Sequence, residues 1–303
     1  MSIDSVQLNF NQGSLWVLNV CLAIIMFGIA LEITVADFKR VVQSPRPATV
    51  GLLSQFILMP ALTFLLVLII RPAPSIALGM MMVAACPGGN ISNFMTHLAR
   101  GNTALSVSLT AMGTVLAIVL TPINLELWAG LYAPTSTLLK QVSLDVVDVF
   151  KTILLIVGIP LVLGMWVRRT REQLAAKISK IAKPLSVIIF AMFVFVAFAN
   201  NFQNFIEHIH WVIWIVLIHN GAALTLGYFF SRINGLDERD SKTIAIETGI
   251  QNSGLGLLLI FSFFNGLGGM AIVAAWWGIW HIISGLSLAY YWSLSGMRAA
   301  SSK

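Results

Sequence analysis

A short polar cluster inside an apolar stretch is the part of this sequence best suited to chemistry. Residues 245–264 read AIETGIQNSGLGLLLIFSFF, where Glu247, Gln251, Asn252 and Ser253 interrupt a run otherwise apolar enough to cross a bilayer. An ionisable residue within a membrane span is costly to bury and typically marks a functional site. Glu247 and Gln251 are four residues apart, so a helix places them on one face. The cluster predicts a polar site inside a membrane, built around one carboxylate.

Other polar residues could complete this site as a place for a hard monovalent cation. Ser106 and Thr110 are also four apart and share a helix face, and Ser92, Asn93 and Gln55 add further neutral oxygens. Zinc prefers His and Cys ligands, which are not clustered here, and calcium prefers several carboxylates, of which only one is available. Sodium is the natural candidate, because unwound carbonyls of broken helices coordinate it in transporters.

The residues alone leave other interpretations open. Glu247 could carry a proton, which makes proton coupling the rival of sodium coupling. Ser106, Thr110 and Gln55 could instead bond to a preceding turn or to a neighbouring helix. An intramembrane enzyme would need a nucleophile–base pair or a metal pair, and none is convincingly placed in the sequence. A passive channel would need a ring of charges or carbonyls along a pore. We expect a transporter and no enzyme.

The composition indicates whether the helices that position these residues lie in water or in a membrane. Only 10% of the 303 residues are charged, 58% are hydrophobic, and the mean hydropathy is +0.88. Soluble domains have about a quarter of their residues charged. Apolar runs of about 20 residues, long enough to cross a bilayer, recur along the chain. The sequence therefore predicts an all-α, polytopic membrane protein whose outer surface faces lipid.

Pro, Gly and polar residues divide the chain into about nine predicted transmembrane helices. Their approximate ranges are 14–35, 48–70, 75–99, 103–122, 148–168, 184–200, 210–231, 242–264 and 269–296. An N-terminus on the outside places fifteen of the 18 Lys and Arg residues in the cytoplasm, in agreement with the positive-inside rule. We expect a multi-pass protein of the cell's inner (plasma) membrane with a cytoplasmic C-terminus. This distribution accounts for the net charge of +6, so no nucleic-acid partner is expected.

Two of these helices carry interruptions beside polar residues. The third span, SIALGMMMVAACPGGNISNFMTHLAR, contains Pro87, Gly88 and Gly89, which favour a break in the helix. The eighth span contains two glycines within residues 247–254. The two spans run in opposite directions in the predicted topology. Such a pair points to an inverted-repeat transporter with a binding site near the bilayer midplane, whereas simple kinks are the alternative.

Three motifs give the chain a family resemblance. MFGIALEIT, CPGGNISNFMTHLARGNTALSVSLT and ETGIQNSGLG resemble the bile acid:sodium symporter family, and the pattern covers nearly the whole chain. The resemblance implies a core domain with two crossing, discontinuous helices, a smaller panel domain and two sodium sites. By this resemblance, the first site comprises Ser92, Asn93, Ser106, Thr110 and Glu247, and the second comprises Gln55, Glu247 and Gln251 with the carbonyls of Thr248 and Ile250. It favours sodium over proton coupling.

The resemblance also implies how the chain is organised. Residues 1–303 form one transmembrane transporter unit. Residues 14–122 are expected to be a first repeat of four helices that lacks the family's first helix, because residues 1–13 are short and polar. Residues 148–296 are expected to be a second, inverted repeat of five helices. No obligate protein partner is indicated.

The expected substrate is an organic anion. Two Na⁺ beside one carboxylate leave a charge of +1, which a monovalent anion would neutralise. Bile acids fit the family, and smaller carboxylates such as pantoate fit as well. Two cavity positions depart from a common bacterial pattern, with Asn90 after the double glycine and Ile282 after the last His. We expect Asn90, Asn252 and His281 to contact the anion, with two Na⁺ moving per substrate by alternating access.

Overall fold

The protein is helical throughout the part that is described. The computed structural model describes residues 3–6, 8, 12–142, 145–200 and 202–301, and within these ranges it contains helices and no strand. In chain order the helices are η1 (Ile3–Ser5), α1 (Gln12–Ala30), α2 (Val35–Gln43), α3 (Pro45–Leu53), η2 (Ser54–Leu58), α4 (Met59–Ile70), α5 (Pro74–Ala85), α6 (Asn90–Leu98), α7 (Thr103–Leu131), α8 (Ala133–Val142), α9 (Val146–Ile153), η3 (Leu154–Gly158), α10 (Ile159–Thr170), α11 (Glu172–Asn200), α12 (Phe202–Ile233), α13 (Glu238–Gly249), α14 (Ser253–Phe263) and α15 (Gly268–Ser301). The predicted all-α class is confirmed.

Several of these helices are long and apolar enough to cross a bilayer. Within the described residues there are six such spans, or seven when α1 and α2, which meet at a bend of 64°, are taken as one. The six are Pro45–Ile70, Thr103–Leu131, Val146–Thr170, Val212–Ile233, Glu238–Phe263 and Gly268–Leu294. The polytopic membrane protein is confirmed, whereas the number nine stays a prediction.

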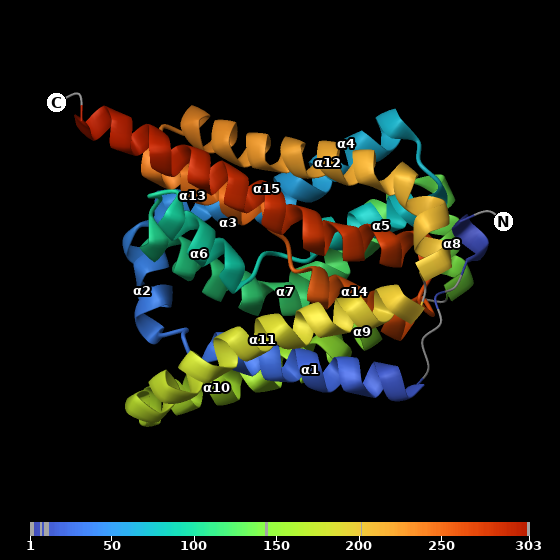
Figure 1. The fold of residues 1–303 in the computed structure, drawn as a ribbon, viewed down its shortest axis with the longest axis horizontal. Helices are drawn as coiled ribbons and strands as arrows, with labels where there is room; N and C mark the ends of the chain where they lie inside the picture. The colour runs from blue at the N-terminus through green and yellow to red at the C-terminus, as the bar shows by residue number, and fades with distance from the viewer. Residues whose placement is uncertain (1–2, 7, 9–11, 143–144, 201, 302–303) are drawn as a thin grey trace.

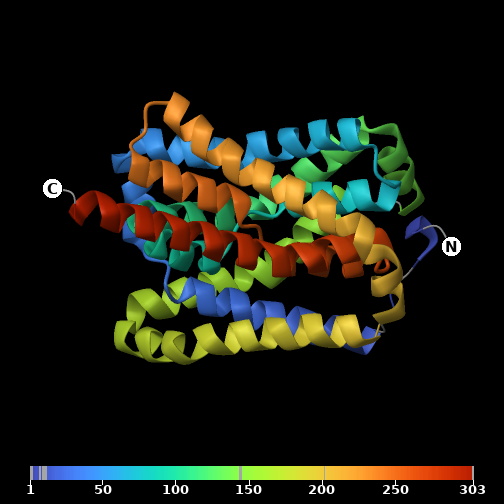
Figure 2. The same ribbon diagram turned by 45° about the horizontal axis from the view of Figure 1, so that its top comes forward.

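The helices form two groups that lie against each other. Helices α1, α10 and α11 pack together along one side of the molecule (Figure 1), and the same three remain side by side when the view is turned (Figure 2). On the other side α12 packs along α13 and α15, and α15 also packs along α5. Helices α5, α6, α7 and α14 lie between these two sides (Figure 1). The polar residues of interest belong to this middle layer and its neighbours.

The two predicted helix interruptions are present, and they contact each other. Helix α5 ends at Ala85 before α6 begins at Asn90, and α13 ends at Gly249 before α14 begins at Ser253. The backbone N–H of Asn252 donates to the carbonyl of Cys86 at 3.1 Å. A Cβ on Gly88 would collide with the carbonyl oxygen of Ile250, so only glycine allows this approach. The contact brings two segments that are far apart in sequence together inside the protein.

A π-helical turn positions Gln55. In η2 the N–H of Met59 bonds to the carbonyl of Ser54, five residues back, and Pro60 follows with no N–H to donate. Such turns widen a helix locally and occur often at functional sites. Ser54, Gln55 and Phe56 of this turn are buried. The turn therefore lets one helix place consecutive polar side chains toward the middle layer.

Two predicted breaks are largely helical. Residues 36–47 were expected to be a loop, but α2 occupies Val35–Gln43, because Thr34 and Asp37 form a capping box with Asp37 Oδ2 2.8 Å from the Thr34 N–H. The polar stretch near 122–147 was expected to separate two helices, but α7 continues past Pro122 to Leu131 and α8 follows. There the Trp128 ring packs 5.5 Å from that of Phe64 and its Nε1–H donates to Asn124.

Two predicted helix starts are also wrong. Helix α11 begins at Glu172 and not near residue 184, and the Glu172 carboxylate pairs with Arg168 at 3.2 Å across the break. Helix α12 begins at Phe202 and not near residue 210. In its first turn Gln203 donates to Glu207 at 3.0 Å, four residues on. Polar residues that suggested loops thus form side-chain pairs of the kind that support helices.

Candidate cation site at the helix crossing

The centre of the site is the carboxylate of Glu247 on α13, which has no exposed surface. Its Oε1 accepts from Ser92 Oγ at 2.7 Å and from Ser106 Oγ at 2.5 Å. Its Oε2 accepts from Gln55 Nε2 at 3.2 Å and lies 3.5 Å from Thr110 Oγ1. Three elements, α6, α7 and η2, thus bring neutral polar groups to one buried carboxylate on α13.

The oxygens of this cluster outnumber the protons available to them. Each hydroxyl has one proton and a second acceptor within reach. For Ser92 that acceptor is the carbonyl of Gly89 at 2.7 Å, and for Ser106 and Thr110 it is Asn93 Oδ1, at 2.7 and 3.2 Å. Lone pairs are therefore left over around Glu247. A bound cation would satisfy them.

No cationic side chain compensates Glu247 among the residues that the structure describes. The ion pairs found there are Arg40–Asp37, Lys151–Asp148, Arg168–Glu172 and Lys242–Glu238. A buried carboxylate without a counter-charge is strongly unfavourable, so it must take up a proton or a cation. Within the described ranges no three His, Cys, Asp or Glu side chains lie close enough to hold one metal ion together. The donors fit a hard monovalent ion better than zinc or calcium.

A second group of oxygens lies beside the first. Gln55 Nε2 also reaches the carbonyl of Glu247 at 3.3 Å, and Gln251 Nε2 donates to the carbonyl of Thr248 at 2.8 Å. The Oε1 atoms of both glutamines are buried without a hydrogen-bond partner. Amide and carbonyl oxygens are electron-pair donors, as a sodium ion requires. The orphaned oxygens at Gln55 and Gln251 therefore fit a second cation.

The sequence-derived residues are distributed as follows. The described structure gathers the five side chains expected at the first sodium site, and it brings Gln55 and Gln251 next to the carbonyls of residues 247 and 248. The carbonyl of Ile250 lies against Gly88. This agreement of position is geometric, and the binding of an ion by these residues stays a prediction.

The three residues expected to contact an anion differ from one another. The side chain of Asn90 lies outside the described part of the structure. Asn252 is half-buried and its Oδ1 accepts from the N–H of Leu255 at 3.0 Å, which caps the start of α14. His281 on α15 is 5% exposed, and its Nδ1 has no hydrogen-bond partner. A role in substrate binding stays a prediction for all three.

Two residues beside the site were not singled out from the sequence. Ser54 in η2 has its Oγ 2.7 Å from Thr248 Oγ1. Asn220 on α12 has no exposed surface and donates from Nδ2 to the carbonyl of Gly249 at 2.8 Å. A signal for Asn220 exists, since it is an amide within the apolar run VLIHNGAAL. Polar residues inside a membrane span merit attention for that reason.

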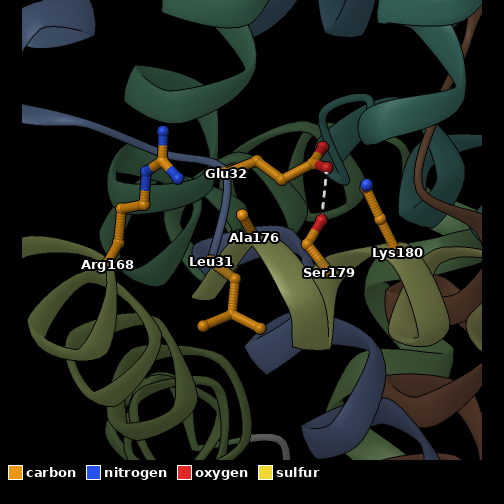
Figure 3. A pocket seen from close by; sticks show the side chains of 6 residues that line it. All are labelled: Leu31, Glu32, Arg168, Ala176, Ser179 and Lys180. Carbon is orange, nitrogen blue, oxygen red and sulfur yellow. Dashed lines mark hydrogen bonds between the residues drawn. The ribbon is translucent and has the colours of Figure 1, made fainter. Parts of the chain in front are cut away.

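A separate cavity of about 290 Å³ lies between the turn that follows α1 and helices α10 and α11. Leu31, Glu32, Arg168, Ala176, Ser179 and Lys180 line it. Ser179 Oγ donates to Glu32 Oε1 at 2.7 Å, and Figure 3 shows this carboxylate pointing toward Ser179 and away from Arg168. The MFGIALEIT motif thus contributes Leu31 and Glu32 to this cavity and nothing to the cluster around Glu247.

Comparison with known proteins finds relatives whose names all refer to sodium-dependent transport. Residues 19–208 match the model of the sodium bile acid symporter family. The chain is 35% identical over 276 residues to the "uncharacterized sodium-dependent transporter YocS" of Bacillus subtilis, covering 91% of this chain and 83% of the relative. It is 30% identical over 281 residues to the "probable sodium/metabolite cotransporter BASS2, chloroplastic" of Oryza sativa, covering 92% of this chain and 64% of that relative.

An animal relative matches over a shorter region. The chain is 29% identical over 239 residues to the ileal sodium/bile acid cotransporter of Homo sapiens, which covers 79% of this chain and 67% of the human protein. The chain therefore spans less than two thirds of the rice protein, about two thirds of the human protein and most of the bacterial one. The names of these relatives all include sodium, and the rice and human names add a metabolite and a bile acid, respectively.

Proposed function

This chain belongs to the sodium bile acid symporter family, and on that premise we propose that it is a sodium-coupled symporter of a monovalent organic anion. The observation that carries the proposal is the buried, uncompensated carboxylate of Glu247 within a cluster that has more acceptors than protons. A cation that enters this cluster removes the cost of the buried charge. The transported ion then supplies the compensation that no side chain provides among the described residues.

We assign one sodium ion to each oxygen group. The first ion is held by Ser92, Asn93, Ser106, Thr110 and Glu247. The second is held by Gln55, Glu247 and Gln251, with the carbonyls of Thr248 and Ile250. The support for the second site is that Gln55 Oε1 and Gln251 Oε1 are buried and unpartnered. Both sites share Glu247, so the loss of this carboxylate should weaken both.

The substrate is proposed from charge arithmetic. Two Na⁺ beside one carboxylate leave a net charge of +1, which a monovalent anion balances. Helices α6 and α14 begin at the crossing, and their N-termini add partial positive charge there. We infer that the anion binds near these N-termini, in reach of Asn90, Asn252 and His281. Bile acid-like molecules and small carboxylates such as pantoate both satisfy this chemistry.

We propose that the N-terminus faces outward and the C-terminus faces the cytoplasm. η1 and the C-terminal end of α15 lie at opposite ends of the helices' common direction (Figure 1). Helix α2, which carries Lys39 and Arg40, lies toward the same end as the end of α15, and so does the end of α10 with Arg168 and Arg169 (Figure 1). A shared basic end supports the positive-inside orientation. The membrane proposed is the inner (plasma) membrane.

The chain is proposed to be one transport unit with two inverted repeats. Residues 14–122 would form the first, with four helices, and residues 148–296 the second, with five. The support is that α5–α6 belongs to the first range and α13–α14 to the second, and each pair is interrupted at the crossing. Alternating access then requires sodium to bind the two conformations unequally.

Proton coupling through Glu247 is the second candidate. The same uncompensated carboxylate favours it, because a proton would neutralise the charge as a cation does. The extra unpartnered oxygens at Gln55 and Gln251 distinguish the two, since a single proton leaves them unsatisfied. We therefore place sodium coupling first.

Uptake into proteoliposomes tests the proposed function. Radiolabelled pantoate and taurocholate serve as probes, and an inward sodium gradient is compared with an inward proton gradient at clamped membrane potential. We expect saturable uptake of a carboxylate driven by sodium, abolished by Glu247→Gln and retained by Glu126→Gln, which changes an exposed acid of α7. Uptake driven by protons in sodium-free buffer would replace sodium coupling with proton coupling.

A further inference from the structure

The end of helix α13 is capped in an uncommon way. The last carbonyls of a helix lack helical N–H partners and must find others when they are buried. Here three carboxamides supply them: Gln55 Nε2 reaches the carbonyl of Glu247 at 3.3 Å, Gln251 Nε2 that of Thr248 at 2.8 Å, and Asn220 Nδ2 that of Gly249 at 2.8 Å. Each carbonyl of the last turn before the break thus has one amide donor.

Asn220 differs from the two glutamines in the bonding of its side-chain oxygen. Its Oδ1 accepts from Ser284 Oγ on α15 at 2.6 Å, so both ends of this carboxamide are bonded. The oxygens of Gln55 and Gln251 are buried without partners. The glutamine oxygens are therefore available to a ligand. Asn220, which has no exposed surface, is committed to the backbone and to α15.

The carbonyl held by Asn220 lies between two proposed sodium ligands. Gly249 is flanked by Thr248 and Ile250, whose carbonyls are assigned to the second sodium ion. A glycine at the end of a helix has wide conformational freedom, so its peptide could rotate and carry the neighbouring carbonyls with it. Nearby, Leu224 of α12 lies so close that a Cβ on Gly249 would collide with it. Helix α12 thus restrains this peptide by packing and by one hydrogen bond.

We propose that Asn220 is a positioning residue for the second sodium site, and that Ser284 in turn holds Asn220. In this proposal Asn220 contacts no transported ion or substrate. By fixing the carbonyl of Gly249, it keeps the carbonyls of Thr248 and Ile250 directed at the ion, and it couples α12 and α15 to the occupancy of the site. The inference rests on the proposed function, since it requires sodium to bind at this place.

Direct sodium binding to the purified protein tests the role of Asn220. Equilibrium binding of ²²Na⁺ in detergent gives the number of ions bound and their separate affinities. We expect the unchanged protein to bind two ions. In Asn220→Ala one ion should bind at least about tenfold more weakly, because a buried carbonyl loses its donor, while the other keeps its affinity. Thr225→Ala, which removes an exposed hydroxyl on the same helix, is the matched control.

A second variant keeps the test decisive if Asn220→Ala does not fold. Ser284→Ala removes the hydroxyl behind Asn220 and should weaken the same ion severalfold, whereas Ser287→Ala, with an exposed hydroxyl on α15, should leave both ions unchanged. The reciprocal variant Ser106→Ala should weaken the other ion.

The possible outcomes separate this inference from the proposed function. Unchanged binding of both ions in Asn220→Ala and Ser284→Ala, or equal weakening of both ions, overturns the positioning role. Equal weakening of both ions would mean that Asn220 supports the structure as a whole and not the second sodium site. Failure of the unchanged protein to bind sodium overturns the proposed function and this inference with it.

Discussion

At the scale of single residues, the decisive feature is an imbalance between acceptors and protons. Hydrogen bonds from Ser92 and Ser106 stabilise the Glu247 carboxylate, and bonds to a charged group are stronger than neutral ones. These donors are neutral, however, so they leave the charge in place. Burial in a membrane protein then makes a cation or a proton part of the stable state.

The first prediction concerns the hydroxyl closest to Glu247. Ser106→Ala removes a donor to Oε1 and one ligand of the first ion, so the sodium concentration for half-maximal uptake should rise about five- to tenfold. Uptake at saturating sodium should keep its apparent affinity for the anion. Sodium titration of uptake in proteoliposomes measures both quantities.

The control for this prediction is Ser108, which lies two residues from Ser106 on the same helix. Ser108 is equally buried on α7 but bonds to the carbonyl of Ala104. Ser108→Ala should therefore leave the sodium dependence unchanged. An equal effect of both substitutions would mean that Ser106 acts only through the packing of α7.

At the scale of elements, the site depends on the contact between two helix breaks. Gly88 in the first break faces the carbonyl of Ile250 in the second, whereas a Cβ on the adjacent Gly89 would meet nothing within 4 Å. Gly89 has extended backbone dihedrals that any residue can adopt. Of these two neighbouring glycines, only Gly88 is needed for the close approach of the two breaks, whereas Gly89 has room for a side chain.

The second prediction uses this difference. Gly88→Ala should push the two breaks apart, lower stability by about 1–3 kcal/mol through overpacking and abolish sodium-driven uptake. Gly89→Ala should change the melting temperature and the stability little. Thermal unfolding in choline chloride, together with uptake, compares the two variants. Retained transport in Gly88→Ala would show that the crossing does not need this approach.

The sequence was informative about the breaks and less so about the ends of elements. Pro87 with two glycines, and the polar run at residues 247–254, predicted both interruptions because these residues remove helical hydrogen bonds or permit other dihedrals. The polar stretch around Gln203 was interpreted as a break, although its side-chain pair supports a helix, and the capping box at Thr34, which starts α2, was not recognised.

The candidate site was predictable in part for a similar reason. Residues at helical spacing, such as Glu247 with Gln251, can be placed on a common face from sequence alone. The π-helical turn at Gln55 and the contact of Asn220 with Gly249 depend on which helices become neighbours. A single amide on an apolar helix does not indicate which carbonyl it will meet. These contacts required the three-dimensional structure.

At the scale of the whole molecule, the two groups of helices give the protein a natural division for movement. Helices α1, α10 and α11 pack together on one side (Figure 2), and the residues of the proposed ion sites belong to α6, α7, η2, α13 and the break after α13, outside this group. Rocking of one group against the other would expose the crossing to either side in turn, as in other transporters with broken helices. We expect occupied sodium sites to favour the crossed, substrate-ready state.

The third prediction concerns charge movement by the complete cycle. Two Na⁺ with one monovalent anion carry one net positive charge inward, so transport should be electrogenic. Reversal-potential measurements on reconstituted protein, with sodium and anion gradients varied separately, determine the ratio. Electroneutral transport would contradict the two-to-one stoichiometry while leaving sodium coupling possible with one ion.

The measurement that tests the central claim most directly is thermal stability of the purified protein in NaCl, KCl and choline chloride. Ligand binding to the folded state predicts a saturable, sodium-specific rise of about 5–10 °C when sodium reaches roughly a hundred times its Kd. Glu247→Gln should lose this rise and Glu126→Gln should keep it. Equal melting temperatures of the unchanged protein in all three salts would contradict a sodium site at the helix crossing.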